Sequence, residues 1–209
     1  MSGNIVKRQH YVWRKYLREW SVKEIINSLI ISTDKLVVTN LMNVAQKRYF
    51  YKFNSLSDGD FKFLESMCDS SAEPVKSLQN DLLVALKMFS ALKELQSEAK
   101  LDTPITLDDL EKNGFEILHT HIENEGTKLL NCRTLNDIEL LFEDLESKYQ
   151  ALMFISFQYF RTKNMRDEIL SQFKDEETEL NFEDMFSFIS IIMATKIAQN
   201  ISFDKKINI

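Results

Sequence analysis

Apolar residues recur at helical spacing through most of the chain after residue 57. One stripe follows Pro74, a residue that suits the first turn of a helix. Its members are Leu78, Leu82, Ala85, Phe89, Leu92 and Leu95. Because residues three or four apart lie on one side of a helix, this spacing predicts an amphipathic helix.

Four polar residues precede apolar stripes in the manner of helix N-caps. They are Ser57, Thr106, Thr134 and Asn181, each followed three residues later by an aspartate. The start at Thr134 opens the longest pattern and predicts a helix that runs to about Arg161. A shorter helix is predicted near residues 165–174.

The first 56 residues have a different pattern. Residues 24–31, 35–41 and 48–53 are short runs that are rich in β-branched or aromatic side chains. Such runs favour strands, and "STD" at 32–34 suits a turn between the first two. We therefore predict a small antiparallel β-element in this part of the chain.

These patterns predict a mainly α (α+β) protein, a bundle of about six helices with a small antiparallel N-terminal β-element. We predict a single domain over residues 1–209, made of an N-terminal segment at 1–56 and a helical bundle at 57–209. Polar stretches at 100–106 and 174–180 are the candidate linkers. Neither stretch is rich in Gly or Ser, which favours one compact unit.

Composition agrees with a folded helical protein. Hydrophobic residues make up 44% of the chain, with fifteen Phe, and only four Gly and two Pro occur. So few turn-forming residues argue against a sandwich or barrel of many strands. The two cysteines, Cys68 and Cys132, are too few for a disulfide framework or a zinc ribbon, and they suit a reducing cytoplasm.

The sequence pattern suggests neither secretion nor membrane insertion. No apolar run follows the basic residues near the N-terminus, so we expect no signal peptide. The most apolar stretch, residues 185–203, is interrupted by Lys196, and its continuous apolar part is shorter than a membrane span requires. We therefore expect a core helix there, no membrane association and a cytoplasmic location.

Charge is distributed unevenly along the chain. Residues 1–52 hold ten Lys or Arg against three Asp or Glu, a net charge of +7, whereas residues 53–209 hold sixteen against twenty-nine, a net charge of −13. A basic end of this kind can face nucleic acid, here through residues 7–23 and 47–52. It can also dock onto the acidic body of its own chain, which is the interpretation we favour, because opposite charges attract within a fold as readily as between partners.

Several common catalytic motifs are missing from the sequence. It contains no GxxxxGK[ST] or GxGxxG phosphate-binding loop, and no GxSxG or HExxH motif. These absences argue against P-loop NTPases, Rossmann oxidoreductases, α/β-hydrolases and zincins. They leave open whether the protein is an enzyme.

Residues 119–125, "HTHIENE", hold two of the three histidines. On a helix, His119 and Glu123 share one face, and His121 and Glu125 share another. One face can supply two ligands to a metal ion or an acid–base pair, and a third metal ligand would come from elsewhere in the fold. We favour the alternative, a polar helix face stabilised by hydrogen bonds.

Gln158 and Arg161 lie three residues apart near the end of a strongly apolar predicted helix. An arginine in this position needs an anion or carbonyl groups as partners. We favour a carboxylate from another helix, such as Glu123. A substrate phosphate is the alternative, because a guanidinium binds phosphate through two parallel hydrogen bonds.

Four stretches, in the same order along the chain, resemble a bacterial family of unknown function. Members of that family open with a Gln-His-Tyr-Val-Pro motif, and residues 9–21 here are "QHYVWRKYLREWS". Residues 43–51 ("NVAQKRYFY") and 117–126 ("ILHTHIENEG") resemble two internal segments of the family. Residues 154–162 ("FISFQYFRT") resemble a helix that ends in Gln, two further residues and Arg-Thr.

The resemblance implies a mainly helical bacterial protein, and it implies no particular reaction. Some members of the family lie near phage-defence or mobile-element genes. Carried over by position, the polar residues that the resemblance singles out are Gln9, His10, Tyr11, Glu123, Gln158 and Arg161.

The sequence departs from the family pattern in two places. Trp13 stands where members have proline, so we expect the turn after His10 to differ. Members also continue into a strand-containing tail with a Ser-Asp-Asn-Pro motif, whereas this sequence ends at "FDKKINI". The chain therefore resembles a C-terminally shortened member of the family.

Two functional hypotheses follow. In the first, the protein is a non-catalytic or partner-dependent interaction module with a protein partner, and the "QHYVW" and "FQYFRT" segments form a buried latch. In the second, it is a nuclease-like effector that processes nucleic acid. His10 is then the general acid–base, Arg161 clamps an anion, and Glu123 belongs to the same polar set.

Under the second hypothesis, the binding residues are Gln9, Tyr11, Arg14, Lys15 and Gln158. Basic side chains would contact phosphates and aromatic rings would stack on bases. A divalent metal cofactor is expected only under this hypothesis. We favour the interaction module, because the sequence contains no complete catalytic constellation.

Overall fold

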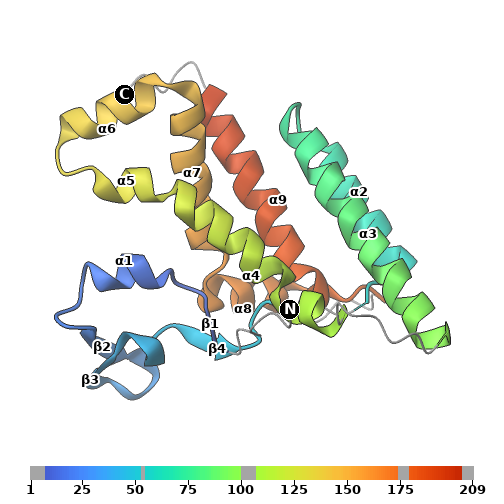
Figure 1. Cartoon of the computed structure of the whole chain (residues 1–209), viewed down its shortest axis with the longest axis horizontal. Helices are drawn as coiled ribbons and strands as arrows, with labels where there is room; N and C mark the ends of the chain where they lie inside the picture. Colours follow the sequence, from blue (N-terminus) through green and yellow to red (C-terminus); the bar gives the residue numbers. More distant parts are fainter. Residues whose placement is uncertain (1–7, 53–54, 100–106, 174–178, 204–209) are drawn as a thin grey trace.

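This computed structural model describes residues 8–52, 55–99, 107–173 and 179–203. These residues contain two small antiparallel β-ladders and nine α-helices (Figure 1). The predicted fold class, mainly α with a small N-terminal β-element, is confirmed. Helices α1 (Arg14–Arg18) and α5 (Thr127–Asn131) have only five residues each. Helices this short leave no periodic stripe in a sequence, so the described residues contain more helices than the six expected.

The first ladder is a hairpin of β2 (Ile25–Ile30) and β3 (Lys35–Asn40), which pair residue for residue along their whole length. Asp34 closes the turn with a left-handed φ of 50°. The strands predicted at 24–31 and 35–41, and the turn between them, are therefore confirmed.

The second ladder joins β1 (Arg8–His10) to β4 (Gln46–Arg48) and forms a separate two-stranded sheet. The strand predicted at 48–53 ends at its first residue, because Arg48 belongs to β4 and residues 49–52 are in no strand, while residue 53 lies outside the described residues. The chain turns at Tyr49, whose φ is 50°, and the next two rings enter the core from this turn, with Tyr51 only 3% exposed. The aromatic run therefore reflects burial of side chains rather than strand pairing.

Helices α2 (Asp58–Asp69) and α6 (Leu135–Glu143) begin where their N-caps predict. The hydroxyls of Ser57 and Thr134 each accept the backbone N–H three residues later, and the aspartate at that position accepts the N–H of the cap residue. This reciprocal capping box satisfies two backbone donors that a helix start leaves unpaired. The predicted start at Thr106 lies outside the described residues, as do the linker residues 100–106 and 174–178.

The helix predicted from Thr134 to about Arg161 is wrong as one continuous element. It breaks at Asp144 into α6 and α7 (Leu145–Phe160). Asp144 has an extended backbone, and its carboxylate accepts the backbone N–H of Ser147 at 2.8 Å. An aspartate in this position is a strong N-cap, so a new helix starts there with a changed direction.

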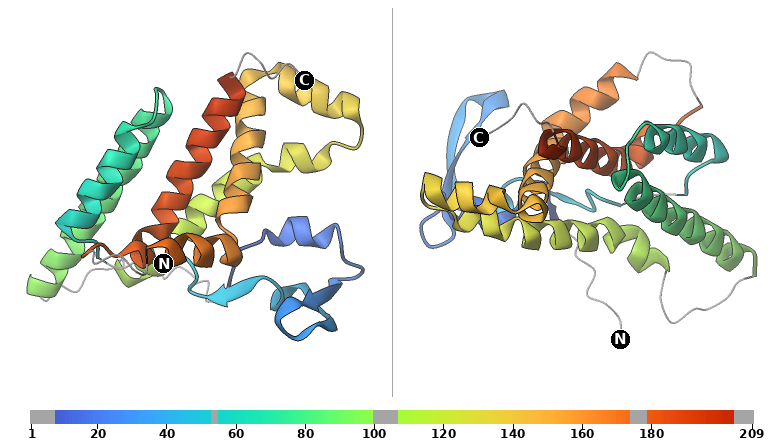
Figure 2. Two further views of the ribbon diagram at one scale, coloured as in Figure 1. Left: turned by 180° about the vertical axis from the view of Figure 1, so that it is seen from behind. Right: turned by 90° about the horizontal axis from the view of Figure 1, so that it is seen from above.

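Helix α9 (Phe182–Phe203) lies between α7 on one side and α2 and α3 (Val75–Ala99) on the other (Figure 2). Asn181 caps it by accepting the backbone N–H of Asp184. By length and composition α9 could cross a membrane, yet 67% of its most apolar window is buried inside the fold. The apolar stretch at 185–203 is therefore the core helix of the bundle.

A buried polar network fixes α3 against α9. Gln79 on α3 is fully buried. Its amide nitrogen donates to Thr195 Oγ1 at 2.7 Å, and its carbonyl oxygen accepts from Ser71 Oγ at 2.7 Å. A buried polar side chain is tolerated when such bonds satisfy it, so Gln79 sets which face of α3 points inward.

Two further helices frame the N-terminal part of the chain. Helix α4 (Leu107–Glu125) packs against α7. Helix α8 (Lys163–Gln172) follows α7 after a turn at Arg161 and corresponds to the helix predicted near 165–174. The ends of α4 and α7 thereby come close to β1, where the candidate residues meet.

Candidate functional site

Arg161 ends α7 and lies at the centre of a buried polar cluster, with 2% of its surface exposed. Its Nη1 donates to Glu123 Oε1 on α4 at 2.5 Å. Its Nη2 donates to the carbonyl oxygen of His10 at 2.5 Å, and its Nε to that of Tyr11 at 3.3 Å. Every guanidinium nitrogen therefore has a partner from the same chain, and the N-terminal segment is tied to the bundle. We call this set of contacts the Arg161 junction.

Aromatic rings cover the guanidinium of Arg161. It lies 5.6 Å from the ring centre of Tyr51 and 5.7 Å from that of Phe157. The Tyr51 hydroxyl donates to the carbonyl oxygen of His10 at 3.1 Å, and burial raises the pKa of this phenol. Tyr51 therefore stays a neutral donor, and cation–π attraction adds to the hydrogen bonds of the junction.

Gln9 is a second attachment of β1 to the bundle and is fully buried. Its Nε2 donates to the carbonyl oxygen of Lys112 on α4 at 2.6 Å. Its Oε1 accepts the backbone N–H of Tyr51 at 2.8 Å. Both ends of the amide are therefore used within the chain and point away from solvent.

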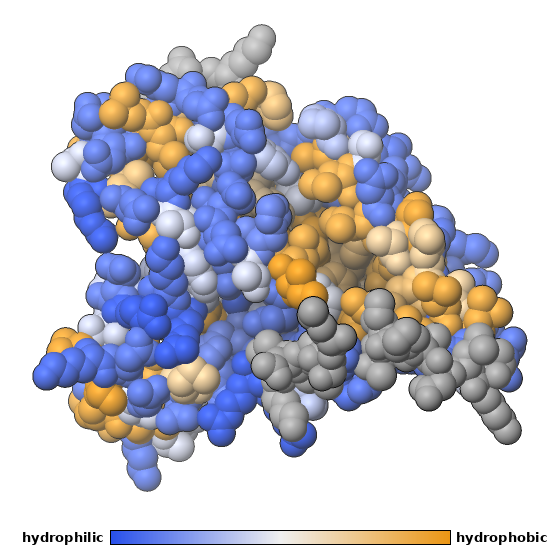
Figure 3. All heavy atoms as spheres, in the orientation of Figure 1, coloured by the Kyte–Doolittle hydropathy of each residue, from blue (hydrophilic) through white to orange (hydrophobic). Residues whose placement is uncertain are grey.

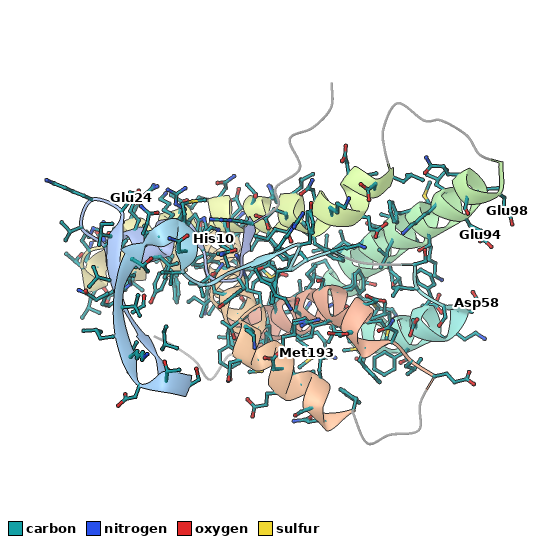
Figure 4. All side chains as sticks on the ribbon, turned by 90° about the horizontal axis from the view of Figure 1, so that it is seen from below. His10, Glu24, Asp58, Glu94, Glu98 and Met193 are labelled. Carbon is teal, nitrogen blue, oxygen red and sulfur yellow. The ribbon has the colours of Figure 1, made fainter. Side chains whose placement is uncertain are left out.

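The ring of His10 does not take part in the Arg161 junction. Only the His10 carbonyl meets Arg161, while the ring Nε2 lies 3.4 Å from the carbonyl oxygen of Leu41. Burial lowers the pKa of His10, and nearby Arg14 and Arg161 lower it further. Figure 4 shows that His10 and Glu24 both belong to the N-terminal part of the chain. The geometry brings the backbone of His10 to Arg161, but not its imidazole.

Trp13 uses a backbone donor that proline lacks. Its N–H donates to Gln158 Oε1 at 3.2 Å, a bond that proline in this position cannot make. The indole packs edge-on against Phe154 on α7, with ring centres 5.3 Å apart. Gln158 therefore joins the N-terminal segment to α7. Tyr11 adds a contact to Phe50, with ring centres 5.2 Å apart.

Two carboxyl groups of α4 lie near Arg161. Burial raises the pKa of Glu123, and this effect outweighs the opposing attraction of Arg161 and the hydrogen bond that Arg161 donates. Burial also raises the pKa of Glu116 to about 7, with Arg161 opposing and Glu123 reinforcing the shift. The Arg161 guanidinium therefore lies near two carboxyl groups, and Glu116 is the one whose pKa lies near neutral pH.

This arrangement predicts a pH-dependent effect of Glu116→Gln. Folding raises the pKa of Glu116 from about 4.5 to about 7. Protonated Glu116 therefore favours the folded chain, and this contribution to stability is complete below about pH 4.5 and is lost as the pH rises through about 7. Because glutamine stays neutral, the variant should gain stability relative to the wild type, on the order of 2 kcal/mol between about pH 5 and pH 8. Urea unfolding at a series of pH values measures this difference. Glu94→Gln, on the exposed surface of α3, is the control, and a difference that does not vary with pH would contradict the assignment.

His119 is buried beside the junction without sharing in its hydrogen bonds. It is 1% exposed, and neither ring nitrogen has a hydrogen-bonding partner among the described residues. Its ring packs edge-on against Tyr51 and Phe157, with ring centres 3.9 and 4.6 Å away. Burial, reinforced by Arg161, lowers its pKa well below the usual value, so the ring is neutral.

The proposed metal ligands His119 and Glu123 do not gather a third ligand. Within the described ranges, no group of three His, Cys, Asp or Glu side chains is placed to hold a metal ion. His121, the neighbouring candidate, is exposed on the far side of α4 from His119. Glu123 is instead the partner of Arg161, which is the pairing favoured from the sequence.

Arg14 and Lys15, the candidate phosphate contacts, already have partners within the chain. Arg14 and Arg18 both pair with Glu24, at 2.6 and 2.7 Å. Lys15 Nζ donates to Thr127 Oγ1 at 3.2 Å. Part of the positive charge in the N-terminal segment is therefore neutralised or engaged by neighbouring side chains.

Sequence reasoning did not identify two members of the cluster, Tyr51 and Glu116. Tyr51 lies in a run that the sequence pattern assigns to a strand, so its position beneath Arg161 has no local signal. Glu116 lies seven residues before Glu123, and this spacing places both on neighbouring parts of one helix side. Helical spacing was therefore the one signal that could have found Glu116.

Comparison with known proteins identifies the family of this chain but gives no function. The model of a family described as "Protein of unknown function (DUF4238)" matches residues 8–206. No curated protein and no solved structure matches the chain.

Proposed function

The chain belongs to the DUF4238 family of proteins of unknown function, and on that premise we propose that it is a non-catalytic interaction module that acts by binding another protein. One observation carries this proposal. Two of the three candidate catalytic side chains, Arg161 and Glu123, pair in a junction where they are 2% and 9% exposed, and His10 contributes only its backbone carbonyl. All three guanidinium nitrogens of Arg161 already donate to its own chain, and the side chain is buried, so the junction is not open to a substrate anion.

The position of His10 supports the same proposal. General acid–base catalysis requires the acting group within hydrogen-bonding reach of the reacting proton. The imidazole of His10 contacts Leu41, while only the backbone of His10 reaches Arg161. The three residues therefore act as a latch between the N-terminal segment and the helical body. We further propose that the protein partner belongs to bacterial phage defence, as the sequence resemblance suggests, so deleting the gene should change phage sensitivity.

A nucleic-acid-binding effector is the second candidate, and one observation favours it. Arg8 on β1 lies directly opposite Arg48 on β4, and Lys47 is next to Arg48. All three are exposed, and no ion pair is formed by them within the described residues. Like charges opposite one another destabilise a ladder unless an anion lies between them, and a phosphate backbone would supply one.

One assay separates the two candidates. Purified protein is mixed with labelled single-stranded DNA, double-stranded DNA and RNA, with Mg²⁺ or Mn²⁺, at low and moderate salt. The interaction module predicts no cleavage and no salt-dependent binding. Cleavage that is lost in a stably folded His10→Ala variant would overturn it. Salt-dependent binding that is lost in Arg8→Glu/Arg48→Glu, without cleavage, would favour a nucleic-acid-binding role.

A further inference from the structure

Helix α3 has more apolar surface than its own fold buries. One side packs inward through residues such as Leu83, Leu86 and Phe89, which are 3–8% exposed. The neighbouring side carries the apolar stripe seen in the sequence, and much of that stripe is exposed. Its large exposed members are Leu78 at 46%, Leu92 at 52% and Leu95 at 56%, and Met88 beside them is 62% exposed. We call these four residues, together with Ala85 between them, the α3 seam.

An apolar groove runs beside the seam. It is a cavity of about 280 Å³ between α3, α4 and α9, and its lining includes Ala85, Leu110 and Phe188. Figure 3 shows hydrophobic side chains around this hollow, between α4 and α3. Leu110 is 39% exposed, and Ile117, seven residues later on the same side of α4, is 65% exposed. Apolar surface therefore continues from α3 across the groove to α4.

The spacing of the α3 seam is that of a coiled coil. Leu78, Ala85 and Leu92 are seven residues apart, and Met88 and Leu95 follow the last two by three residues. These are the a and d positions of a heptad repeat, the seam along which two helices pack. A surface helix that packs only against its own bundle needs a single apolar stripe, whereas α3 has a second one.

We propose that the α3 seam binds the α3 seam of a second copy of this chain in antiparallel orientation. In that register Leu78 lies opposite Leu95 of the second copy, and Ala85 opposite Met88 of the second copy. The pattern is self-complementary about a point between residues 86 and 87, as a two-fold symmetric contact requires. A small side chain then faces a large one at the centre of the contact, and two leucines face each other at each end.

The length of α3 agrees with this occupant. A helix of 25 residues is about 37 Å long. A contact along that length, with the α4 side of the groove, approaches the ~800 Å² per partner that a stable interface buries.

Asp81 stands at the one remaining d position of the repeat and would face Leu92 of the second copy. A single polar residue in a seam specifies register at the expense of affinity. This contact between two copies goes beyond the proposed function, because an interaction module can act as a monomer or as a dimer.

Sedimentation velocity of the full chain over a wide concentration range tests the proposal. The wild type should form a dimer, and Met88→Glu and Leu92→Glu should weaken it at least about tenfold by placing charge in the seam. Both residues are more than half exposed, so the variants should fold. Leu140→Glu, at a 57% exposed residue of α6, is the matched control and should leave the dimer unchanged. Asp81→Leu should tighten the dimer.

A monomer at all concentrations, or a dimer that Met88→Glu and Leu92→Glu leave intact, would overturn the proposal. Cysteine cross-linking in a Cys132→Ser background tests the orientation. The double variant Ala85→Cys/Met88→Cys should form a disulfide-linked dimer on oxidation, because these positions face each other. Leu78→Cys alone should not, and its cross-linking would show parallel packing instead.

Discussion

Replacing Arg161 by methionine is expected to lower the free energy of unfolding by about 3–5 kcal/mol, the effect of breaking a buried ion pair by removing one partner. Methionine fills a similar volume, so the loss reflects the missing charge and donors rather than a cavity. The variant leaves Glu123 buried without its cation, and it leaves the carbonyl oxygens of His10 and Tyr11 without the guanidinium donors. Urea unfolding at neutral pH, followed by circular dichroism, measures the change.

Two further variants serve as comparisons for Arg161→Met. Arg133→Met changes an arginine whose side chain is 67% exposed, and it should shift the free energy of unfolding by less than about 0.5 kcal/mol. Arg161→Lys keeps the charge but has no planar fork to reach three acceptors, so it should recover only part of the loss. An Arg161→Met variant as stable as the wild type would contradict the structural role of the junction.

Replacing Gly126 by alanine is expected to destabilise the fold by about 3 kcal/mol, at the upper end of the usual effect of overpacking. A Cβ at Gly126 would lie 2.3 Å from two ring atoms of Phe154, well inside van der Waals contact. The Phe154 ring is 4% exposed and packs against Trp13, so it has little room to move. The substitution would push α7 away from the start of α5, or the ring into Trp13. Thermal or urea unfolding of the variant gives the magnitude.

Gly59→Ala is the matched control, since it makes the same chemical change inside α2. A Cβ there would lie 3.5 Å from Ser57 Oγ and 3.6 Å from Leu180, which are ordinary contacts. Alanine in a helix is favoured over glycine, so this variant should be more stable by up to about 1 kcal/mol. Changes of the same sign and size in Gly59→Ala and Gly126→Ala would show that close packing at Gly126 is not the cause.

The parts of the fold that local sequence could predict are those that local chemistry determines. Ser57 and Thr134 start helices because their hydroxyls pair with backbone groups only three residues away. The break at Asp144 was missed because the apolar stripe continues across it. The β1–β4 ladder was missed because its strands have three residues each and lie far apart in the sequence.

In the candidate site, too, some features could be predicted from the sequence and others depend on the tertiary structure. Pairing of Arg161 with Glu123 could be predicted, because a buried arginine needs a carboxylate and α4 offers one. The orientation of His10 could not, since only the tertiary structure turns its carbonyl toward Arg161 and its ring toward Leu41. The exposure of the α3 stripe could not be predicted either. A helical stripe indicates an apolar face, but it does not indicate what covers that face.

A double-mutant cycle on Arg161 and Glu123 tests most directly whether this cluster is a structural junction. It compares the unfolding free energies of the wild type, Arg161→Met, Glu123→Met and the double variant. We predict that each single variant loses several kcal/mol and that the double variant loses about 2–3 kcal/mol less than the sum, because it leaves no unpaired buried charge. The two carbonyl oxygens that Arg161 also binds should keep the double variant less stable than the wild type. Single variants that are as stable as the wild type or more stable, with no coupling between them, would contradict this account, since that result is typical of charges held for catalysis rather than for the fold.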